Sequence, residues 1–304
     1  MPIRLVLAAL TLLLYGLPAR SDWRETVGAF RVGFVASGNA GDATARMEPF
    51  RLAFAEGLGV NVELFAARDY ATLVDALGGS RIEYAILSSA AHALAKVRCD
   101  CIEPVVIARD GDGSLASRQV LIAAAGQPEN PAQYKGRRIG ALRSSAFGGF
   151  DIAIDGLNAA GLDLAANDAA LQLFESSAAL LQGLADGQVD AVIGWVAGDG
   201  PADSARRGTM AQMSTLGIDA ARFRIVWQSV AVPNRLHSVR RSLPGEAKSK
   251  LREILSAMFD ADPVAYDSVE PDHGGGFIVA RESQIEPLVE IIRRMRGSDD
   301  SAGQ

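Results

Sequence analysis

The chain has 304 residues and a formal net charge of -6 at pH 7, with 49% hydrophobic and only 6% aromatic residues. This length is sufficient for two lobes with separate cores, and the abundance of small side chains favours α/β packing over an all-β sandwich. The acidic balance, without any run of lysine and arginine, argues against a nucleic-acid-binding protein, which would carry a clustered basic face.

Residues 1–21 have the features of a cleaved export signal. Arg4 precedes an apolar run over 5–14, and Ala19 and Ser21 have the spacing that a signal peptidase site requires. The run is shorter than the roughly 20 residues of a membrane-spanning helix. No later stretch reaches that length, and no cysteine near the cleavage site could carry a lipid. We therefore expect a soluble protein that acts outside the cytoplasm and does not span the membrane.

Strands and helices alternate along the first part of the remaining chain. Strands are predicted over 30–36, 60–65, 82–87 and 102–108, and helices over 47–58, 70–77 and 90–97. A polar loop over 110–117 follows. This alternation predicts an α/β lobe with a mainly parallel sheet and helices on its faces.

A second round of the same alternation follows the polar loop. Strands are predicted over 120–125, 138–142, 171–174, 189–195 and 223–228, and helices after 149 and over 177–185. The chain then returns through a short strand at 239–241 and helices over 245–259 and 285–295, before a polar tail predicted to be disordered over 297–304. We assign 22–118 and 231–296 to lobe I and 119–230 to lobe II, hinged by two crossing strands.

The two cysteines, Cys99 and Cys101, are separated by one residue. An extended chain would place both thiols on one side, but a disulfide across one residue strains the backbone; it remains an alternative in an oxidising compartment. No histidine or third cysteine nearby completes a zinc set. We favour a structural role over redox or metal chemistry, and we predict no metal site and no cofactor.

The stretch 138–160 is predicted to form a strand, a polar turn and a helix, with Ser144 and Ser145 in the turn. Such a turn presents unpaired backbone N–H groups, the positive end of the helix dipole and hydroxyl groups to one small volume, which suits an oxyanion. The alternative is that one serine is an ordinary helix N-cap.

Similar pairs follow other predicted strands. They are Ser37-Gly38, Ser88-Ser89 and Ser176-Ser177. Ligands of open α/β sheets bind beyond the carboxyl ends of the strands, where helix N-termini converge. Each pair alone is better explained as a cap, but pairs in both lobes together predict a hydroxyl-rich cleft for an anion or polar solute.

Four further residues could reach this cleft. His92 falls on the first turn after Ser88-Ser89, although a lone histidine on a helix is more often a packing residue. Arg118 and Arg143 could neutralise an anion, although solvated arginines near turns are common. Trp195 could form a wall of the cleft, and core packing is an equally good interpretation. The sequence contains no G-x-S-x-G, H-E-x-x-H or Walker motif, and we predict no enzymatic activity.

Residues 30–294 resemble the periplasmic phosphonate-binding proteins of ABC transporters and their phosphate and phosphite relatives. The resemblance rests on an ordered series of short segments: MEPF at 47–50, LGV at 58–60, DYA at 69–71, IEYAIL at 82–87, YKGRRI at 134–139, DGQVDA at 186–191, VWQS at 226–229 and VPN at 232–234.

This resemblance implies a two-lobed type II periplasmic-binding-protein-like fold that binds its ligand at helix N-termini and performs no chemistry. The residues that would line the cleft by position are Tyr70, Ser88, Ser89, His92, Ser144, Ser145, Ala146, Phe147 and Ser177. The family also implies a periplasmic location and an inner-membrane ABC permease as partner. We expect a monomer.

The chain departs from the family at three places. The central turn has Ser145-Ala146-Phe147-Gly148 where the family has Ser-Thr-Ser-Gly. Ser177 stands in place of a histidine, and Ser117 and Arg118 in place of an aromatic pair. Each lost hydroxyl donor would cost about 1–3 kcal/mol of affinity for the same anion.

The sequence therefore predicts a periplasmic solute-binding protein that captures a small anionic solute, phosphonate-like or phosphate-like, for uptake by an ABC transporter. Binding would favour the closed form of the two lobes, since the solute contacts both lobes only in that form. The alternatives are a ligand-sensing receptor for a membrane signalling partner and, with less support, an exported enzyme on the same fold.

Overall fold

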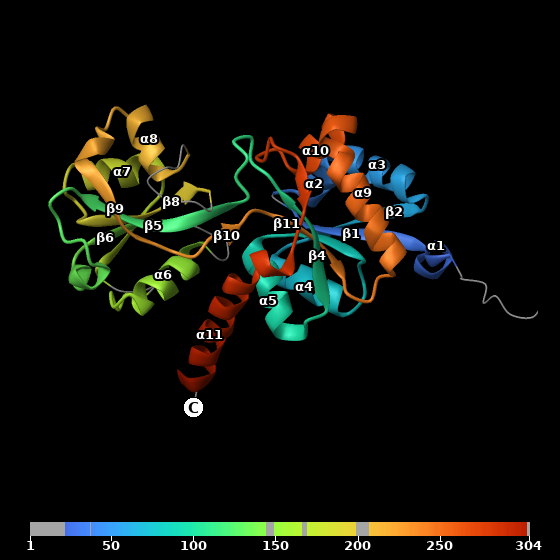
Figure 1. The fold of residues 1–304 in the computed structure, drawn as a ribbon, viewed down its shortest axis with the longest axis horizontal. Coiled ribbons are helices and arrows are strands. Elements are labelled where there is room, and N and C mark those ends of the chain that lie inside the picture. The colour runs from blue at the N-terminus through green and yellow to red at the C-terminus, as the bar shows by residue number, and fades with distance from the viewer. Residues whose placement is uncertain (1–21, 37, 144–148, 166–168, 199–206, 303–304) are drawn as a thin grey trace, which may run out of the picture.

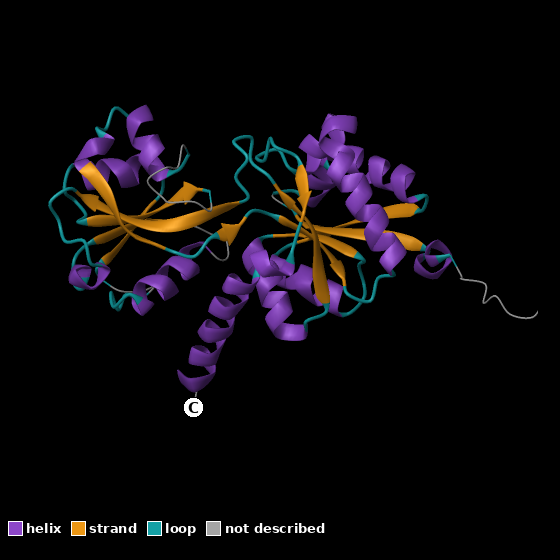
Figure 2. Ribbon diagram, viewed as in Figure 1, coloured by secondary structure: helices purple, strands orange, loops and turns teal. Residues whose placement is uncertain are grey.

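Two β-sheets with helices on both faces form two lobes that lie side by side in a computed structural model of the chain (Figures 1 and 2). The structure describes residues 22–36, 38–143, 149–165, 169–198 and 207–302. The predicted export signal, 1–21, lies outside these residues. Among the described helices, none has the length and apolar character needed to cross a bilayer.

Lobe I is built around a sheet with the strand order β12-β4-β11-β3-β1-β2. Its strands are β1 (Ala29–Val35), β2 (Asn61–Ala67), β3 (Tyr84–Leu87), β4 (Ile102–Ala108), β11 (Leu236–Arg240) and β12 (Phe277–Val279). Its helices are α1 (Trp23–Val27), α2 (Ala40–Arg46), α3 (Glu48–Leu58), α4 (Tyr70–Gly78), α5 (Ser89–Cys99), α9 (Gly245–Ala261), α10 (Pro263–Val269) and α11 (Glu286–Ala302). Figure 1 shows α3, α9 and α10 on one face of this sheet and α4 and α5 on the other.

Lobe II contains a sheet with the order β10-β5-β8-β6-β7, and β9 also pairs with β5. Its strands are β5 (Ala116–Ala124), β6 (Ile139–Leu142), β7 (Leu171–Phe174), β8 (Ala191–Ala197), β9 (Phe223–Gln228) and β10 (Val232–Pro233). Its helices are α6 (Gly149–Ala159), α7 (Ser177–Ala185) and α8 (Thr209–Thr215). Helix α6 covers one face, and α7 and α8 cover the other (Figure 1).

The predicted two-lobed α/β architecture is confirmed, but the sheets are mixed rather than mainly parallel. At one side of each sheet, three neighbouring strands pair in parallel: β2-β1-β3 in lobe I and β7-β6-β8 in lobe II. The other pairings are antiparallel: β11 with β3 and β4, and β12 with β4, in lobe I, and β5 with β8, β9 and β10 in lobe II. Buried strands of either direction are similar apolar runs, so the sequence pattern does not reveal direction.

The two crossings lie beside each other because β10 pairs with the first residues of β5, Val232 opposite Ser117 and Pro233 opposite Ala116. The second sheet therefore extends from Ala116 to Pro233. Its two ends, which the sequence analysis placed in lobe I, hydrogen-bond within the lobe II sheet.

Short elements were missed by the sequence analysis. Helix α1 has 5 residues, α10 has 7 and β12 has 3, which are too few to show a clear hydrophobic period. Helix α11 extends over Glu286–Ala302 and so includes most of the tail that is predicted from the sequence to be disordered. The polar composition after Gly297 removes an apolar face, but no proline stops the helix.

Helix α11 contacts both lobes. It packs along α5 of lobe I and also reaches α6 of lobe II. Leu288 of α11, Ala93 of α5 and Ile152 of α6 belong to one buried apolar cluster. An ion pair at 2.9 Å joins Arg294 Nη2 to Asp155 Oδ2 on α6. These contacts give the two lobes a second connection besides the crossings.

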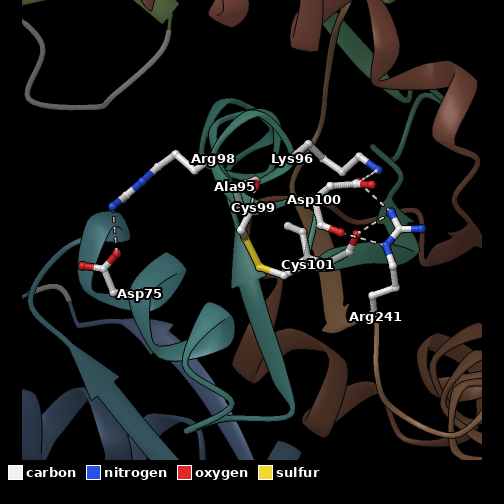
Figure 3. Close-up of a disulfide and its surroundings, with 9 residues drawn as sticks. Asp75, Ala95, Lys96, Arg98, Cys99, Asp100, Cys101 and Arg241 are labelled. Carbon is white, nitrogen blue, oxygen red and sulfur yellow. Dashed lines mark hydrogen bonds and ion pairs between the residues drawn. A yellow bond between two sulfur atoms is a disulfide. The ribbon is translucent and has the colours of Figure 1, made fainter.

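The cysteines form a disulfide, Cys99–Cys101, that joins the last residue of α5 to the residue before β4 (Figure 3). Asp100 between them is in the left-handed region, with φ of 45°. Its carboxylate pairs with Lys96 Nζ at 2.5 Å and with Arg241 Nη2 at 2.8 Å. The disulfide and these ion pairs together fix the tight reversal between α5 and β4, in agreement with the structural role favoured by the sequence.

A buried carboxylate links the central strands of lobe I. Glu83, with a side chain only 2% exposed, accepts hydrogen bonds from the Arg31 backbone N–H at 2.8 Å and from Arg31 Nη2 at 3.0 Å. The Arg240 Nε atom lies 3.7 Å from the same carboxylate. Glu83 therefore satisfies a backbone donor of β1 and binds guanidinium groups from β1 and β11.

Replacing Glu83 by alanine should lower the free energy of unfolding by about 2 kcal/mol, because a buried backbone donor and a partly buried guanidinium lose their acceptor. Water can reach Arg31, whose side chain is 38% exposed, which limits the loss. The matched control is Glu175→Ala, which removes the partner of Arg143 from a pair that is 59% and 78% exposed and should cost less than about 1 kcal/mol. Urea denaturation of both variants measures the difference, and equal losses would contradict this role of Glu83.

Candidate functional site

A pocket of about 460 Å³ lies at the carboxyl edge of the lobe I sheet. Its lining comes from the ends of β1 and β3, from α2, from the start of α4, from the residue before β11, and from the end of α10 with the loop that follows it. The lining residues are Phe34, Val35, Ala43, Arg46, Met47, Tyr70, Ile86, Arg235, Ser268, Val269, Pro271 and Asp272. Two arginines, Arg46 and Arg235, and one acidic residue, Asp272, belong to this lining.

Arg235 is held at the pocket by lobe I itself. Its Nη1 atom donates to the Val269 carbonyl at 3.2 Å and lies 3.5 Å from Glu270 Oε2. Glu270 is buried and also hydrogen-bonds His237 Nε2 and His273 Nδ1, each at 2.8 Å. The guanidinium is thus anchored on one side, while its residue lines the pocket.

The charge state of Glu270 follows from these contacts. Burial alone raises the pKa of this carboxyl group, but the hydrogen bonds from His237 and His273 and the nearby Arg235 charge outweigh burial and lower the pKa to about 2. Burial also lowers the pKa of His237, even though Glu270 is its partner. The carboxylate is therefore ionised at neutral pH and counterbalances Arg235.

A second, smaller pocket of about 150 Å³ lies at the carboxyl edge of the lobe II sheet. It is formed by the ends of β6 and β8, the starts of α6 and α7, and by α8 and β5. The lining residues are Gln119, Ala141, Leu142, Phe150, Ser177, Leu180, Leu181, Ile193, Gly194, Trp195, Thr209 and Gln212.

Close packing of α8 on β8 shapes this second pocket. Thr209 Oγ1 accepts a hydrogen bond from the Trp195 backbone N–H at 2.9 Å. A Cβ atom at Gly194 would lie only 2.5 Å from the same oxygen, so a glycine is required where the helix approaches the strand. The Trp195 ring is thereby carried on a strand whose position is fixed.

Both pockets lie at the sheet edges that carry the crossings. Strand β4 ends at the carboxyl edge of lobe I, and β5 starts at the corresponding edge of lobe II, where Gln119 lines the smaller pocket. Arg235 lines the larger pocket directly before β11. An ion pair at 3.1 Å between Asp110 Oδ1 of the first crossing and Arg207 Nη1 of lobe II also joins the lobes at this edge.

The structure places three of the predicted site residues in these pockets: Tyr70 in lobe I, and Ser177 and Trp195 in lobe II. Other predicted residues lie outside the described part of the chain, and these are Ser37, Ser144, Ser145, Ala146 and Phe147.

Ser88 and Ser89 do not line either of these pockets. Ser88 is the N-cap of α5, since its Oγ accepts from the Ala91 backbone N–H at 3.2 Å, and Ser89 is buried. The capping alternative therefore accounts for this pair. Ser176 caps α7 in the same way, which leaves Ser177 in the first turn and against the pocket.

The expectation that His92 faces the cleft is wrong. The ring is fully buried, with Nδ1 2.8 Å from Ser238 Oγ of β11, and Nε2 has no hydrogen-bond partner among the described residues. The helix turns this side chain toward the sheet, so the packing alternative is correct. Burial, together with the charges of Lys96 and Arg241, lowers the pKa of His92 to about 3.

The two predicted arginines also differ from expectation. Arg118 Nη1 donates to the Ser229 carbonyl at 2.8 Å, so this side chain joins the two crossings. Arg143 follows β6 but pairs with Glu175 at 2.6 Å on the surface. Neither lines one of the two pockets. Both residues stand near strand ends, as predicted. The guanidinium of Arg118, however, hydrogen-bonds a backbone carbonyl, and that of Arg143 pairs with a carboxylate.

Sequence reasoning missed several residues of the two pockets, including Arg46, Arg235, Gln119, Gln212 and Thr209. Arg46 ends α2, Arg235 and Gln119 stand at antiparallel strands, and Thr209 and Gln212 lie on α8, so none of them directly follows the end of a parallel strand. Within the described ranges, no group of histidine, cysteine and acidic side chains is arranged to hold a metal ion.

Replacing His92 by glutamine should flatten the pH dependence of stability between about pH 6 and pH 4. The pKa of the folded ring, about 3, is below the ordinary value near 6.5, so the unfolded chain binds the extra proton. The stability due to the neutral ring is complete above about pH 6.5 and is lost as the pH falls toward 3. One proton corresponds to a slope of roughly 1 kcal/mol per pH unit.

The measurement is urea denaturation at pH 7, 6, 5 and 4 for the wild type, His92→Gln and Ser238→Ala. Ser238→Ala keeps the buried ring and should keep the slope. An unchanged slope in His92→Gln would show that the ring is not the group that titrates.

Comparisons with known proteins agree with this architecture. Residues 32–285 match the family model of ABC-transporter phosphonate periplasmic substrate-binding proteins. No curated protein sequence gives a match. The structure of XAC2383 from Xanthomonas citri bound to ATP has a TM-score of 0.62 and 17% identity, covering 89% of this chain and 98% of that one. PhnD1 from Prochlorococcus marinus in complex with methylphosphonate has a TM-score of 0.56 and 13% identity, covering 89% and 99%.

A phosphonate-transporter binding component from Pseudomonas aeruginosa has a TM-score of 0.51 and 18% identity, covering 86% of this chain and 85% of that one. At these identities the structures establish the fold alone. The sequence match, by contrast, includes both sheets and both crossings. The chain therefore belongs to the family of periplasmic substrate-binding proteins of ABC phosphonate transporters.

Proposed function

We propose that this protein captures a small solute with an oxyanion group, phosphonate-like or phosphate-like, between its two lobes. The observation that carries the proposal is the pair of pockets at the carboxyl edges of the two sheets, on either side of the crossings. The lobe I pocket brings two guanidinium groups, and the lobe II pocket includes the first residue of α7.

The chemistry of these groups suits an oxyanion. Guanidinium groups form short, charge-assisted hydrogen bonds with phosphonate and carboxylate oxygens. The first N–H groups of a helix have no acceptor within the helix, and the helix dipole favours negative charge there. In α7 the Ser176 side chain satisfies the Ala179 N–H, so Ser177 can offer both its hydroxyl and its N–H to a ligand.

Binding would act through a shift between open and closed lobes. A solute that touches both pockets gains all its contacts only when the lobes approach, so it favours the closed form. We propose that this form delivers the solute to an inner-membrane ABC permease. We also propose that residues 1–21 direct export to the periplasm and that the protein acts as a monomer. Methylphosphonate and ATP, bound by two structural relatives, are both phosphorus oxyanions.

A thermal-shift screen of the protein from Asp22 onward tests this function, with phosphate, phosphite, methylphosphonate, sulfonates and amino acids. A ligand present at 100 times its dissociation constant adds about 2.7 kcal/mol to stability, which raises the melting temperature measurably. We expect a shift with at least one phosphorus oxyanion. A shift with amino acids alone would contradict the proposal.

Replacing Arg235 by glutamine should weaken binding of that oxyanion about 10-fold or more, because a charge-assisted hydrogen bond is lost. Arg143→Gln is the matched control, since it removes a guanidinium that is paired on the surface. Isothermal titration calorimetry measures both affinities, and melting of the ligand-free proteins shows whether each variant folds. Equal affinities in the two variants would exclude Arg235 from the site.

A further inference from the structure

The smaller pocket differs sharply in character from the larger one. Its walls are mainly apolar and come from separate elements: Leu142, Phe150, Leu180, Leu181, Ile193 and Trp195. Three of these side chains, Leu180, Leu181 and Ile193, are buried. The wall is therefore part of the packed core of lobe II, and its shape is fixed before any ligand binds.

None of the residues that line this pocket in the described part of lobe II carries a charge. The polar side chains there are two carboxamides, Gln119 and Gln212, and the hydroxyls of Ser177 and Thr209. The Thr209 oxygen already accepts the Trp195 N–H. An ammonium group against these described lining residues would lose its hydration without gaining a carboxylate from them, which is costly. An apolar group would make van der Waals contacts with the same side chains without losing the hydration of a charge.

The size of the pocket, about 150 Å³, sets an upper limit for such a group. An apolar cavity of that volume lined by leucine, isoleucine and phenylalanine side chains is large enough for benzene. A methyl group alone would leave most of the wall without contacts. Wall atoms that face empty space lose the dispersion attraction that a larger group would provide.

We propose that the lobe II pocket binds an uncharged apolar substituent of the solute, an aryl or branched alkyl group up to the size of a benzene ring. The inference rests on the proposed function, because the oxyanion would then lie at the rim, near Ser177 and the lobe I arginines. The ligand class is thus an aryl- or alkyl-substituted oxyanion, and amine-bearing phosphonates are disfavoured.

The test compares affinities by calorimetry for phenylphosphonate, methylphosphonate and 2-aminoethylphosphonate, together with benzenesulfonate and methanesulfonate. We expect the phenyl compound to bind about 10-fold or more tightly than the methyl compound with the same anionic group, because the ring buries additional apolar surface. Ala141 at the end of β6 lines the pocket and also belongs to the buried cluster that includes Ile139 and Leu157, so added atoms there reduce the space at the pocket wall. Ala141→Leu should reduce the phenyl-to-methyl affinity ratio toward one, because it weakens binding of the phenyl compounds most.

The matched control is Ala43→Leu, which adds the same atoms to the lobe I pocket and should keep the ratio. Melting of each ligand-free variant verifies folding. Equal or tighter binding of the methyl or aminoethyl compound overturns the inference while the proposed function stands. A phenyl preference among sulfonates only, with no phosphonate binding, supports the apolar pocket and rejects a phosphorus ligand. If Ala43→Leu abolished the phenyl preference and Ala141→Leu kept it, the phenyl ring would bind in the lobe I pocket, and the inference would be overturned.

Discussion

The pairing of β10 with the start of β5 is the constraint on which the two half-sites depend. It brings the outgoing and returning crossings together at the carboxyl edges of both sheets. Parallel βαβ units place their helix N-termini at that edge, so the first turns of these helices lie on the same side of each sheet as the crossings. A crossing at the opposite edge would have separated the two pockets by the thickness of both lobes. The site is therefore a consequence of where the chain passes between lobes.

Within lobe I, a buried ionic cluster connects the core to this edge. Tyr84 hydrogen-bonds His237, His237 and His273 hydrogen-bond Glu270, and Glu270 lies beside Arg235. A buried carboxylate is unfavourable unless it is paired and hydrogen-bonded, and here two imidazoles and a guanidinium meet that need. The arrangement fixes one face of Arg235 and gives the pocket a cation whose position does not depend on a ligand.

The sequence predicted the elements better than the site, for a physical reason. Strands 102–108, 171–174 and 223–228 have the predicted bounds, because apolar runs and turn residues are local signals. Strand direction and side-chain environment are long-range properties. Tyr70, Ser177 and Trp195 were found because they stand at or near the ends of parallel strands. His92 was misplaced because its surroundings depend on β11, which is more than 140 residues away in the chain. Arg235 was missed because its surroundings also depend on residues that are distant in the chain.

The division of charge between the lobes bears on what this family member selects. The lobe I pocket has charged lining residues, Arg46, Arg235 and Asp272, whereas the described lining of the lobe II pocket is uncharged and mostly apolar. The sequence of the central turn is also less polar than the family pattern, since Ala146 and Phe147 stand where that pattern has hydroxyl residues. Fewer hydroxyl donors reduce discrimination through hydrogen bonds, while apolar walls discriminate by shape and buried area. These features together support the proposal that the family fold is kept while the organic substituent of the ligand contributes much of its recognition.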